Sequence, residues 1–267
     1  MKTRILVAAV ALLGLAGCNQ PLPDRALVTT LRVLGVRAEP PEAAPGTTVH
    51  FDALVADPKG NGRVLKRAWA ICNPGQGGVG TCGNPANTAV LGSGLTADWT
   101  VPADALSGLS ATDAEMGRDV YVVLGVEFDD GTGQTDRSDH DVAFKRIRLS
   151  TNADPNRNPK IDSLFVEKSP AATQPVASGA TLAIDAAPSA DSRQKWSSPN
   201  GTSGEEDARF TWLITAGSLD SDVTYADGPT VTNAWHTPGG SGDLTLWVVL
   251  RDGRGGIDWA TRTVTRP

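Results

Sequence analysis

LTLWVVLRDGRGGIDWATRTVT, residues 244–265, is the stretch that decides the fold. Leu244, Leu246, Val248 and Leu250 occupy every second position, so they share one face of an extended strand. DGRGG then turns the chain, and IDWATRTVT runs back as a partner strand. Because Asp-Gly between two alternating runs is a strong short-range hairpin signal, the stretch predicts an antiparallel β-hairpin.

The same pattern occurs twice in the chain. The matching landmarks, in order, are KRAWAIC and RFTWLITAG around Trp69 and Trp212, WTVP and WHTP at Trp99 and Trp235, and Asp-Gly turns at Asp130 and Asp252. Landmarks that recur in one order predict two units of the same fold in tandem. We expect the four tryptophans to be core residues, where each buries a large apolar area.

Other segments also alternate with period two, as in Val49 to Val55 and in Phe210 to Ile214. No long segment carries the apolar stripe of a helix. Short strands separated by turn signals imply two packed sheets per unit. The sequence therefore predicts an all-β chain of two tandem β-sandwiches, at 27–150 and 161–267. The polar segment 151–160 joins them and is expected to act as a semi-stiff hinge.

The second unit, from NPKIDSLFVEKSP to the last strand, resembles PKD and related immunoglobulin-like domains of bacterial surface lipoproteins. Those domains place a tryptophan on an early central strand and end with a D-G-x-G-G hairpin, which Trp212 and residues 252–256 match. The first unit departs from the pattern, since Gly133 and Gln134 stand where the second has Gly255 and Gly256. The resemblance implies an immunoglobulin-like fold and an adhesion or spacer role.

The N-terminus reads as an export signal, with a basic start and an apolar run over residues 5–17. A spanning helix needs about 20 apolar residues, so this run is too short. The following LAGC resembles the lipobox of bacterial lipoproteins, in which the cysteine is lipidated and the peptide is cut before it. This implies a signal peptide at 1–17, a covalent lipid on Cys18 and a tether over 18–26.

A cleaved secretory signal with an incidental cysteine is the alternative interpretation. Asn19 is not the aspartate that retains such lipoproteins at the inner membrane, which favours the outer membrane of a bacterial envelope. The expected partners are therefore the membrane, reached through the lipid, and an unknown envelope protein or saccharide.

The net charge is −6, and no stretch concentrates lysine and arginine, which argues against nucleic acid as a partner. The sequence has no G-x-S-x-G, no phosphate-binding loop and no dinucleotide fingerprint. These features favour a non-catalytic protein. A competing hypothesis is an enzyme or enzyme accessory whose site lies in the loops at 72–82 and 191–207.

Cys72 and Cys82 are the remaining cysteines, and in an exported chain two such thiols predict one disulfide. Their spacing fits neither a C-x-x-C redox motif nor a four-ligand zinc site.

Calcium is the metal that the sequence favours. Carboxylates and amides gather around the last turn of the first unit and in the linker; the candidate ligands are Asp129, Asp130, Asp136, Asp154, Asn156 and Asn158. Calcium takes six to eight oxygen ligands, which these groups can supply. The alternative is that the same residues form turns, cap loops and keep an edge strand soluble.

Trp196 lies in a polar insertion, residues 191–207, between two predicted strands. Binding modules often carry a contact aromatic on such a loop, so Trp196 is a candidate ligand-binding residue. A lone exposed tryptophan without a role is the alternative. A saccharide-binding module would instead use Trp196 or Trp247 in an exposed aromatic row.

Overall fold

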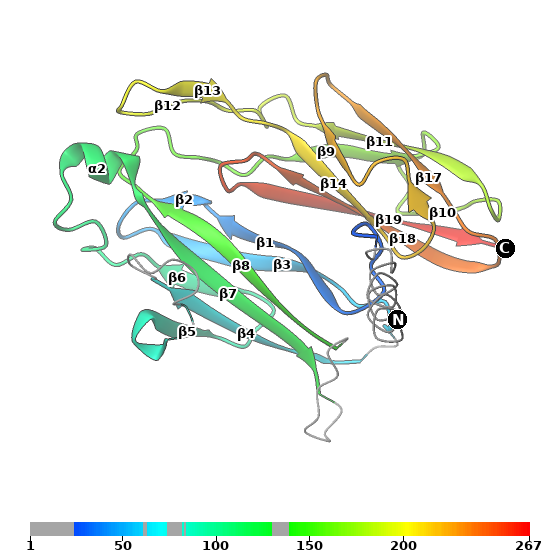
Figure 1. The fold of residues 1–267 in the computed structure, drawn as a ribbon, viewed down its shortest axis with the longest axis horizontal. Coiled ribbons are helices and arrows are strands. Elements are labelled where there is room, and N and C mark those ends of the chain that lie inside the picture. The colour runs from blue at the N-terminus through cyan, green and yellow to red at the C-terminus, as the bar shows by residue number, and fades with distance from the viewer. Residues whose placement is uncertain (1–23, 61–62, 74–81, 83, 130–138) are drawn as a thin grey trace, which may run out of the picture.

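The computed structural model describes residues 24–60, 63–73, 82, 84–129 and 139–267, and nearly all of their regular structure is β-strand (Figure 1). The strands form two sandwiches, one after the other in the chain. Within the described residues, no helix is long and apolar enough to cross a membrane.

The first sandwich pairs a sheet of order β1-β3-β6 with a sheet of order β2-β8-β7-β4-β5. The strand bounds are β1 Arg32–Glu39, β2 Glu42–Ala43, β3 Thr48–Ala56, β4 Leu65–Cys72, β5 Thr88–Gly92, β6 Ala97–Thr100, β7 Arg118–Phe128 and β8 His140–Leu149. A 3-10 turn, η2 Pro85–Asn87, and a short helix, α2 Ala111–Met116, lie in the connections.

The second sandwich pairs a sheet of order β15-β17-β11-β9 with a sheet of order β10-β19-β18-β14-β16. The strand bounds are β9 Ile161–Val166, β10 Thr173–Pro175, β11 Thr181–Pro188, β14 Arg209–Ile214, β15 Ser218–Leu219, β16 Val223–Tyr225, β17 Val231–His236, β18 Gly242–Arg251 and β19 Ile257–Arg266. A separate hairpin of β12 Lys195–Ser197 and β13 Ser203–Glu205 projects from it.

Both sandwiches have immunoglobulin-like topology. In the second, the order β9-β11-β17-β15 corresponds to strands A-B-E-D of that fold, and β19-β18-β14 corresponds to G-F-C. In the first, β1-β3-β6 and β8-β7-β4 correspond to A-B-E and G-F-C. The predicted fold class, all-β with two tandem immunoglobulin-like sandwiches, is confirmed.

Each sandwich has its own core, centred on the repeated tryptophan of its strand C. Trp69 is fully buried and stacks on Phe51 with ring centroids 6.3 Å apart. Trp212 is equally buried and stacks on Phe210 at 6.1 Å. Trp235 is buried as expected, whereas Trp99 only packs against the edge of the first core.

The hairpin predicted at the end of the chain is present as β18 and β19. Asp252 stabilises its turn, because Oδ1 accepts hydrogen bonds of 2.8 Å from the backbone N–H groups of Arg254, Gly255 and Gly256. Gly256 is required by close approach, since a Cβ there would lie 2.1 Å from the Asp252 carboxylate and 2.8 Å from the Arg157 carbonyl.

The predicted disulfide between Cys72 and Cys82 is confirmed. Cys72 ends β4, and the bond ties that strand to the connection leading to β5.

The two sandwiches also pack directly against each other. A third apolar cluster joins β1 and β3 of the first sandwich to the outer face of β14, β18 and β19 of the second; it comprises Val28, Leu34, Ala56, Leu213, Trp247, Val249 and Ile257, with Leu54 and Trp259 at its border. Gly35 allows this contact, because a Cβ there would lie 2.9 Å from Ile257. Strand β18 is therefore buried on both faces.

Candidate functional site

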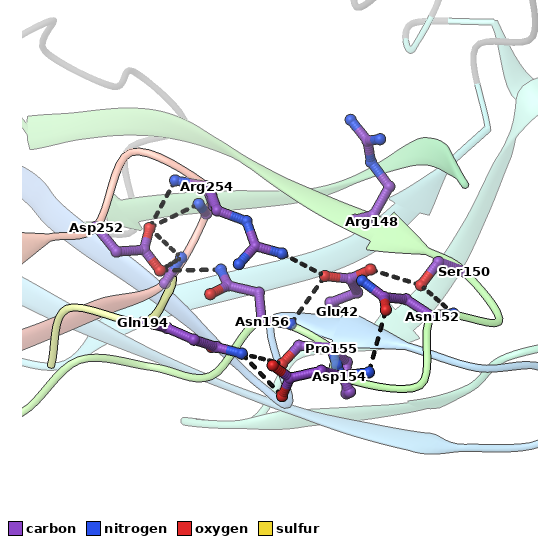
Figure 2. A network of polar contacts seen from close by, with 12 residues as sticks. Glu42, Arg148, Ser150, Asn152, Asp154, Pro155, Asn156, Gln194, Asp252 and Arg254 are labelled. Atoms are coloured by element: carbon purple, nitrogen blue, oxygen red, sulfur yellow. Dashed lines mark hydrogen bonds and ion pairs between the residues drawn. The ribbon is translucent and has the colours of Figure 1, made fainter. Parts of the chain in front are cut away.

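A polar network follows the segment that joins the two sandwiches (Figure 2). Asn156 is 2% exposed; its backbone N–H donates to Glu42 in β2 at 2.8 Å, and its Nδ2 donates to Asp252 in the β18–β19 turn at 2.9 Å. One linker residue thus contacts both sandwiches, the first through its backbone and the second through its side chain. Glu42 also accepts a 2.5 Å hydrogen bond from Ser150.

Arg254 completes this network from the hairpin turn. Its guanidinium donates to Glu42 at 3.2 Å and to Glu206 at 2.9 Å, and both carboxylates are buried. Burial raises the pKa of Glu206 to about 7, and the nearby Asp252 adds to the rise. The backbone N–H of Gln194 and the guanidinium of Arg254 both lower this pKa and so oppose the change. Arg254 therefore balances a cluster of buried carboxylates that belong to both sandwiches.

The linker is fixed at its second half as well. Asn158 donates from Nδ2 to the Ala38 carbonyl at 2.7 Å and accepts from the Ile257 N–H at 2.9 Å. Residues 26–28 act similarly, since Val28 and Ala26 exchange backbone hydrogen bonds with Ile214 of the second sandwich. A semi-stiff hinge was expected; in the structure the segment is held against both units because its amides satisfy buried backbone and carboxylate groups.

Beside this junction a cleft of about 590 Å³ opens between the two sandwiches. The first sandwich contributes the free edge of β1 and the middle of β8, and the second contributes the β18–β19 turn and the ends of β14 and β16. Its charged lining residues are Lys145, Arg146, Arg209, Arg251 and Asp207. A surplus of cations in a chain of net charge −6 makes this cleft distinctive.

Strand register creates one wall of the cleft. Tyr225, Arg209, Arg251 and Ile257 are paired in turn across β16, β14, β18 and β19, so the four side chains form a row on the outer face of the sheet. Burial, and then the neighbouring Arg209, lower the pKa of Arg251. The guanidinium of Arg251 donates to the Leu34 carbonyl of β1 at 3.1 Å, which joins this wall to the first sandwich.

Lys145 projects from β8 and is 8% exposed. Its ammonium donates to the Gly255 carbonyl in the hairpin turn of the other sandwich. Burial lowers the pKa of Lys145 to about 8, Arg251 and Arg146 lower it further, and Asp252 opposes the change. The cleft is thus lined by a buried amine whose pKa, about 8, is close to neutral pH.

The structure gives most of the described calcium candidates other partners. Asp129 pairs with Lys66, and Asp154 accepts from Gln194 at 3.1 Å. Asn156 and Asn158 belong to the junction described above. In the part of the chain that the structure describes, no group of three or more His, Cys, Asp or Glu side chains is placed to hold a metal ion. Asp130 and Asp136 lie outside the described residues, and the calcium site stays a prediction.

The aromatic candidates have different surroundings from those expected. Trp196 is half-buried in the β12–β13 hairpin, where its ring covers Gly204 and the Arg254 guanidinium lies 5.8 Å from it. Trp247 is 8% exposed and belongs to the contact between the sandwiches. A saccharide platform at Trp247 is therefore wrong, because the second face of β18 is covered. Cys18, with its predicted lipid, lies outside the described residues.

The sequence carried two signals for this site. LWVVL is apolar at consecutive positions, which is typical of a strand buried on both faces. Lys145, Arg146 and Arg148 lie within four positions of β8, so the expectation that no stretch concentrates lysine and arginine is wrong at this strand. Arg209 and Arg251 are far from them in sequence, so only strand register and the packing of the two sandwiches bring the cations together.

No family model and no curated protein matches the sequence. Among solved structures, the chain is similar to the D00-D0 domain of Intimin, with 9% identity over 90% of this chain and 100% of that chain and a TM-score of 0.28. It is similar to the N-terminal Ig1-2 module of Drosophila Receptor Protein Tyrosine Phosphatase DLAR, with 10% identity, coverage of 89% and 99%, and a TM-score of 0.29. The Yersinia pseudotuberculosis adhesin InvE matches with 12% identity, coverage of 88% and 60%, and a TM-score of 0.24. Such TM-scores support no assignment of ligand or activity.

Proposed function

We propose that this chain is a bacterial envelope lipoprotein, held to a membrane by lipid on Cys18, and that its two sandwiches act as a non-catalytic binding module. The observation that carries the proposal is the cationic cleft between the sandwiches. Ligand sites are concave and frequent at domain interfaces, and this cleft is concave and lies between the two sandwiches. Its partner is an envelope component that enters the cleft.

The fixed geometry of the junction supports binding over a simple spacer. A spacer requires length alone, whereas here an apolar cluster, a buried linker and several side-chain bonds hold one sandwich against the other. Such contacts keep the walls of the cleft in place before a ligand arrives, which lowers the entropy lost on binding.

The tether meets the folded part of the chain at the junction between the sandwiches. Ala26 and Val28 pair with Ile214, so the described chain begins at the junction between the sandwiches. From Cys18 to Asp24 an extended chain reaches about 20 Å. The lipid would therefore hold the Ile214 end of β14 toward the lipid surface, with the cleft at the Arg209 end of the same strand, and the outer membrane is the surface that Asn19 favours.

Replacement of Cys18 tests the tether. In cells, Cys18→Ala should abolish lipid attachment and leave residues 1–17 uncut, because the cut precedes the lipidated cysteine; the wild-type protein should be cut, lipidated and found with the membrane. The matched control, with Cys72→Ala and Cys82→Ala together, should stay with the membrane. Mass spectrometry of the native protein should find lipid on Cys18. An unmodified thiol there, with residues 1–17 still attached, would refute the proposal.

A further inference from the structure

We infer that the cleft binds a small oxyanion built on a ring, such as a sugar acid or a sugar phosphate. This inference rests on the proposed binding function and names the class of ligand for that same site. It depends on four features of the cleft: its charge, its paired arginines, its free donors and its exposed rings.

The charge of the lining selects an anion. Four cationic residues line the cleft together with one carboxylate, Asp207, and of the four Arg146 also lies 3.8 Å from Asp119. The net charge of the whole chain is −6, so this cluster of positive charge is opposite in sign to the chain as a whole. Low-dielectric walls on both sides strengthen the attraction for an anion over what an exposed cluster would give.

Two of these cations are paired across neighbouring strands. Arg209 and Arg251 lie directly opposite each other on β14 and β18. Among the described residues, neither forms an ion pair within 4.0 Å, and like charges in this arrangement destabilise a sheet. A carboxylate or phosphate between the two guanidiniums would remove the repulsion, since their planar N–H groups match the geometry of an oxyanion.

Further donors face the same space. The Lys145 ammonium has three hydrogens and one described acceptor, the Gly255 carbonyl, so donors remain for a ligand. Gly253 and Gly255 also line the cleft; a Cβ at Gly253 would have no atom within 4 Å, and the nearest atom to one at Gly255 would lie 3.8 Å away. Without side chains there, a ligand can approach the backbone of the hairpin turn closely.

The two aromatic side chains of the cleft indicate a ring on the ligand. Phe144 is 50% exposed and comes from the first sandwich, while Tyr225 is 56% exposed and comes from the second. Each offers a flat apolar surface beside the cations, which suits the apolar face of a sugar ring. The volume of about 590 Å³ is in the range of small-molecule sites.

Calorimetric titration of the full chain, purified in detergent, tests the inference. The probes are digalacturonate, glucose 6-phosphate, inorganic phosphate and neutral maltose. We expect both charged sugars to bind, phosphate to bind more weakly, and maltose to give no binding. Arg209→Gln, at an exposed position, and Lys145→Met should each weaken binding of the charged sugars by about tenfold or more. Lys168→Gln removes one charge outside the cleft and should leave the affinity unchanged.

Tyr225→Ala tests recognition of the sugar ring separately from recognition of the charge. It should weaken binding of glucose 6-phosphate and leave binding of inorganic phosphate unchanged. Absence of binding by both charged sugars would overturn the inference, as would maltose binding equally well or unchanged affinity in both cleft variants. Equal affinity for phosphate and for glucose 6-phosphate would overturn the inference that the cleft recognises the sugar ring. These outcomes are independent of Cys18, so failure of the ligand and failure of the membrane tether can be distinguished.

Discussion

Arg37 of the first sandwich and Asp258 of the second form an ion pair of 3.0 Å between residues 221 positions apart in the chain. The same guanidinium binds Asp52 of its own sandwich at 2.7 Å and lies 4.7 Å from the ring centre of Trp259. Asp258 in turn accepts from the Ile161 N–H at 2.8 Å, where the second sandwich begins. Through Asp258, Arg37 of the first sandwich is thus linked to Ile161, the first residue of β9 in the second sandwich.

A double-mutant cycle with Arg37→Ala and Asp258→Ala should measure a coupling free energy of about 1 kcal/mol, because both side chains are only partly exposed. Chemical denaturation provides the free energies of unfolding. The cycle with Asp52→Ala is the matched control within one sandwich, and it should give a similar coupling. No coupling between Arg37 and Asp258 would show that the sandwiches are held together without this pair.

Trp247→Ala should destabilise the protein by about 3–5 kcal/mol, since it opens a cavity in the apolar contact between the sandwiches. We expect the calorimetric transition to broaden or split as the two units uncouple. Trp196→Ala, at the half-buried tryptophan of the β12–β13 hairpin, is the control and should cost less. A smaller loss for Trp247 than for Trp196 would contradict this account of the junction.

The pH dependence of stability should report Glu206. In the unfolded chain this carboxyl ionises near 4.5, whereas in the folded protein it keeps its proton until about 7. The folded state therefore binds more protons between these values, and the free energy of unfolding should fall as pH rises through this range, by about 3 kcal/mol at most.

Glu206→Gln should remove that slope, and Asp207→Asn, at the neighbouring exposed position, should preserve it. Thermal melts at a series of pH values provide the measurement. An unchanged slope in Glu206→Gln would assign the pH dependence to other groups.

Binding of digalacturonate should weaken as pH rises through about 8, the pKa to which burial lowers Lys145. Above this value the side chain is neutral and attracts the carboxylate less. Lys145→Met should bind more weakly at pH 7 and lose the pH dependence over this range. If that variant kept the wild-type profile, Lys145 would not be the titrating group.

Reduction of the disulfide between Cys72 and Cys82 should lower the free energy of unfolding by about 3 kcal/mol in the chain-entropy model, given the sequence separation of 10. Denaturant unfolding with and without a thiol reductant measures the change. The Cys72→Ala and Cys82→Ala double variant should already be destabilised and should not respond to reductant. An equal response of both proteins would assign the effect elsewhere.

The sequence alone determined the fold class, the repeat, the closing hairpin and the disulfide. These depend on local chemistry: alternation of apolar residues sets a strand, Asp252 with its glycines sets a turn, and two cysteines in one loop can meet. The core positions of Trp69 and Trp212 followed from their place in the repeat.

Only the tertiary structure decided how the two units meet, and hence where the cleft lies. The apolar run LWVVL indicates that both faces of β18 are buried, but it does not reveal that the first sandwich is what covers Trp247 and Val249. Likewise, Lys145 and Arg251 are 106 positions apart, and nothing local brings them together. Their proximity depends on strand register and on long-range packing, which a linear pattern of residue types does not encode.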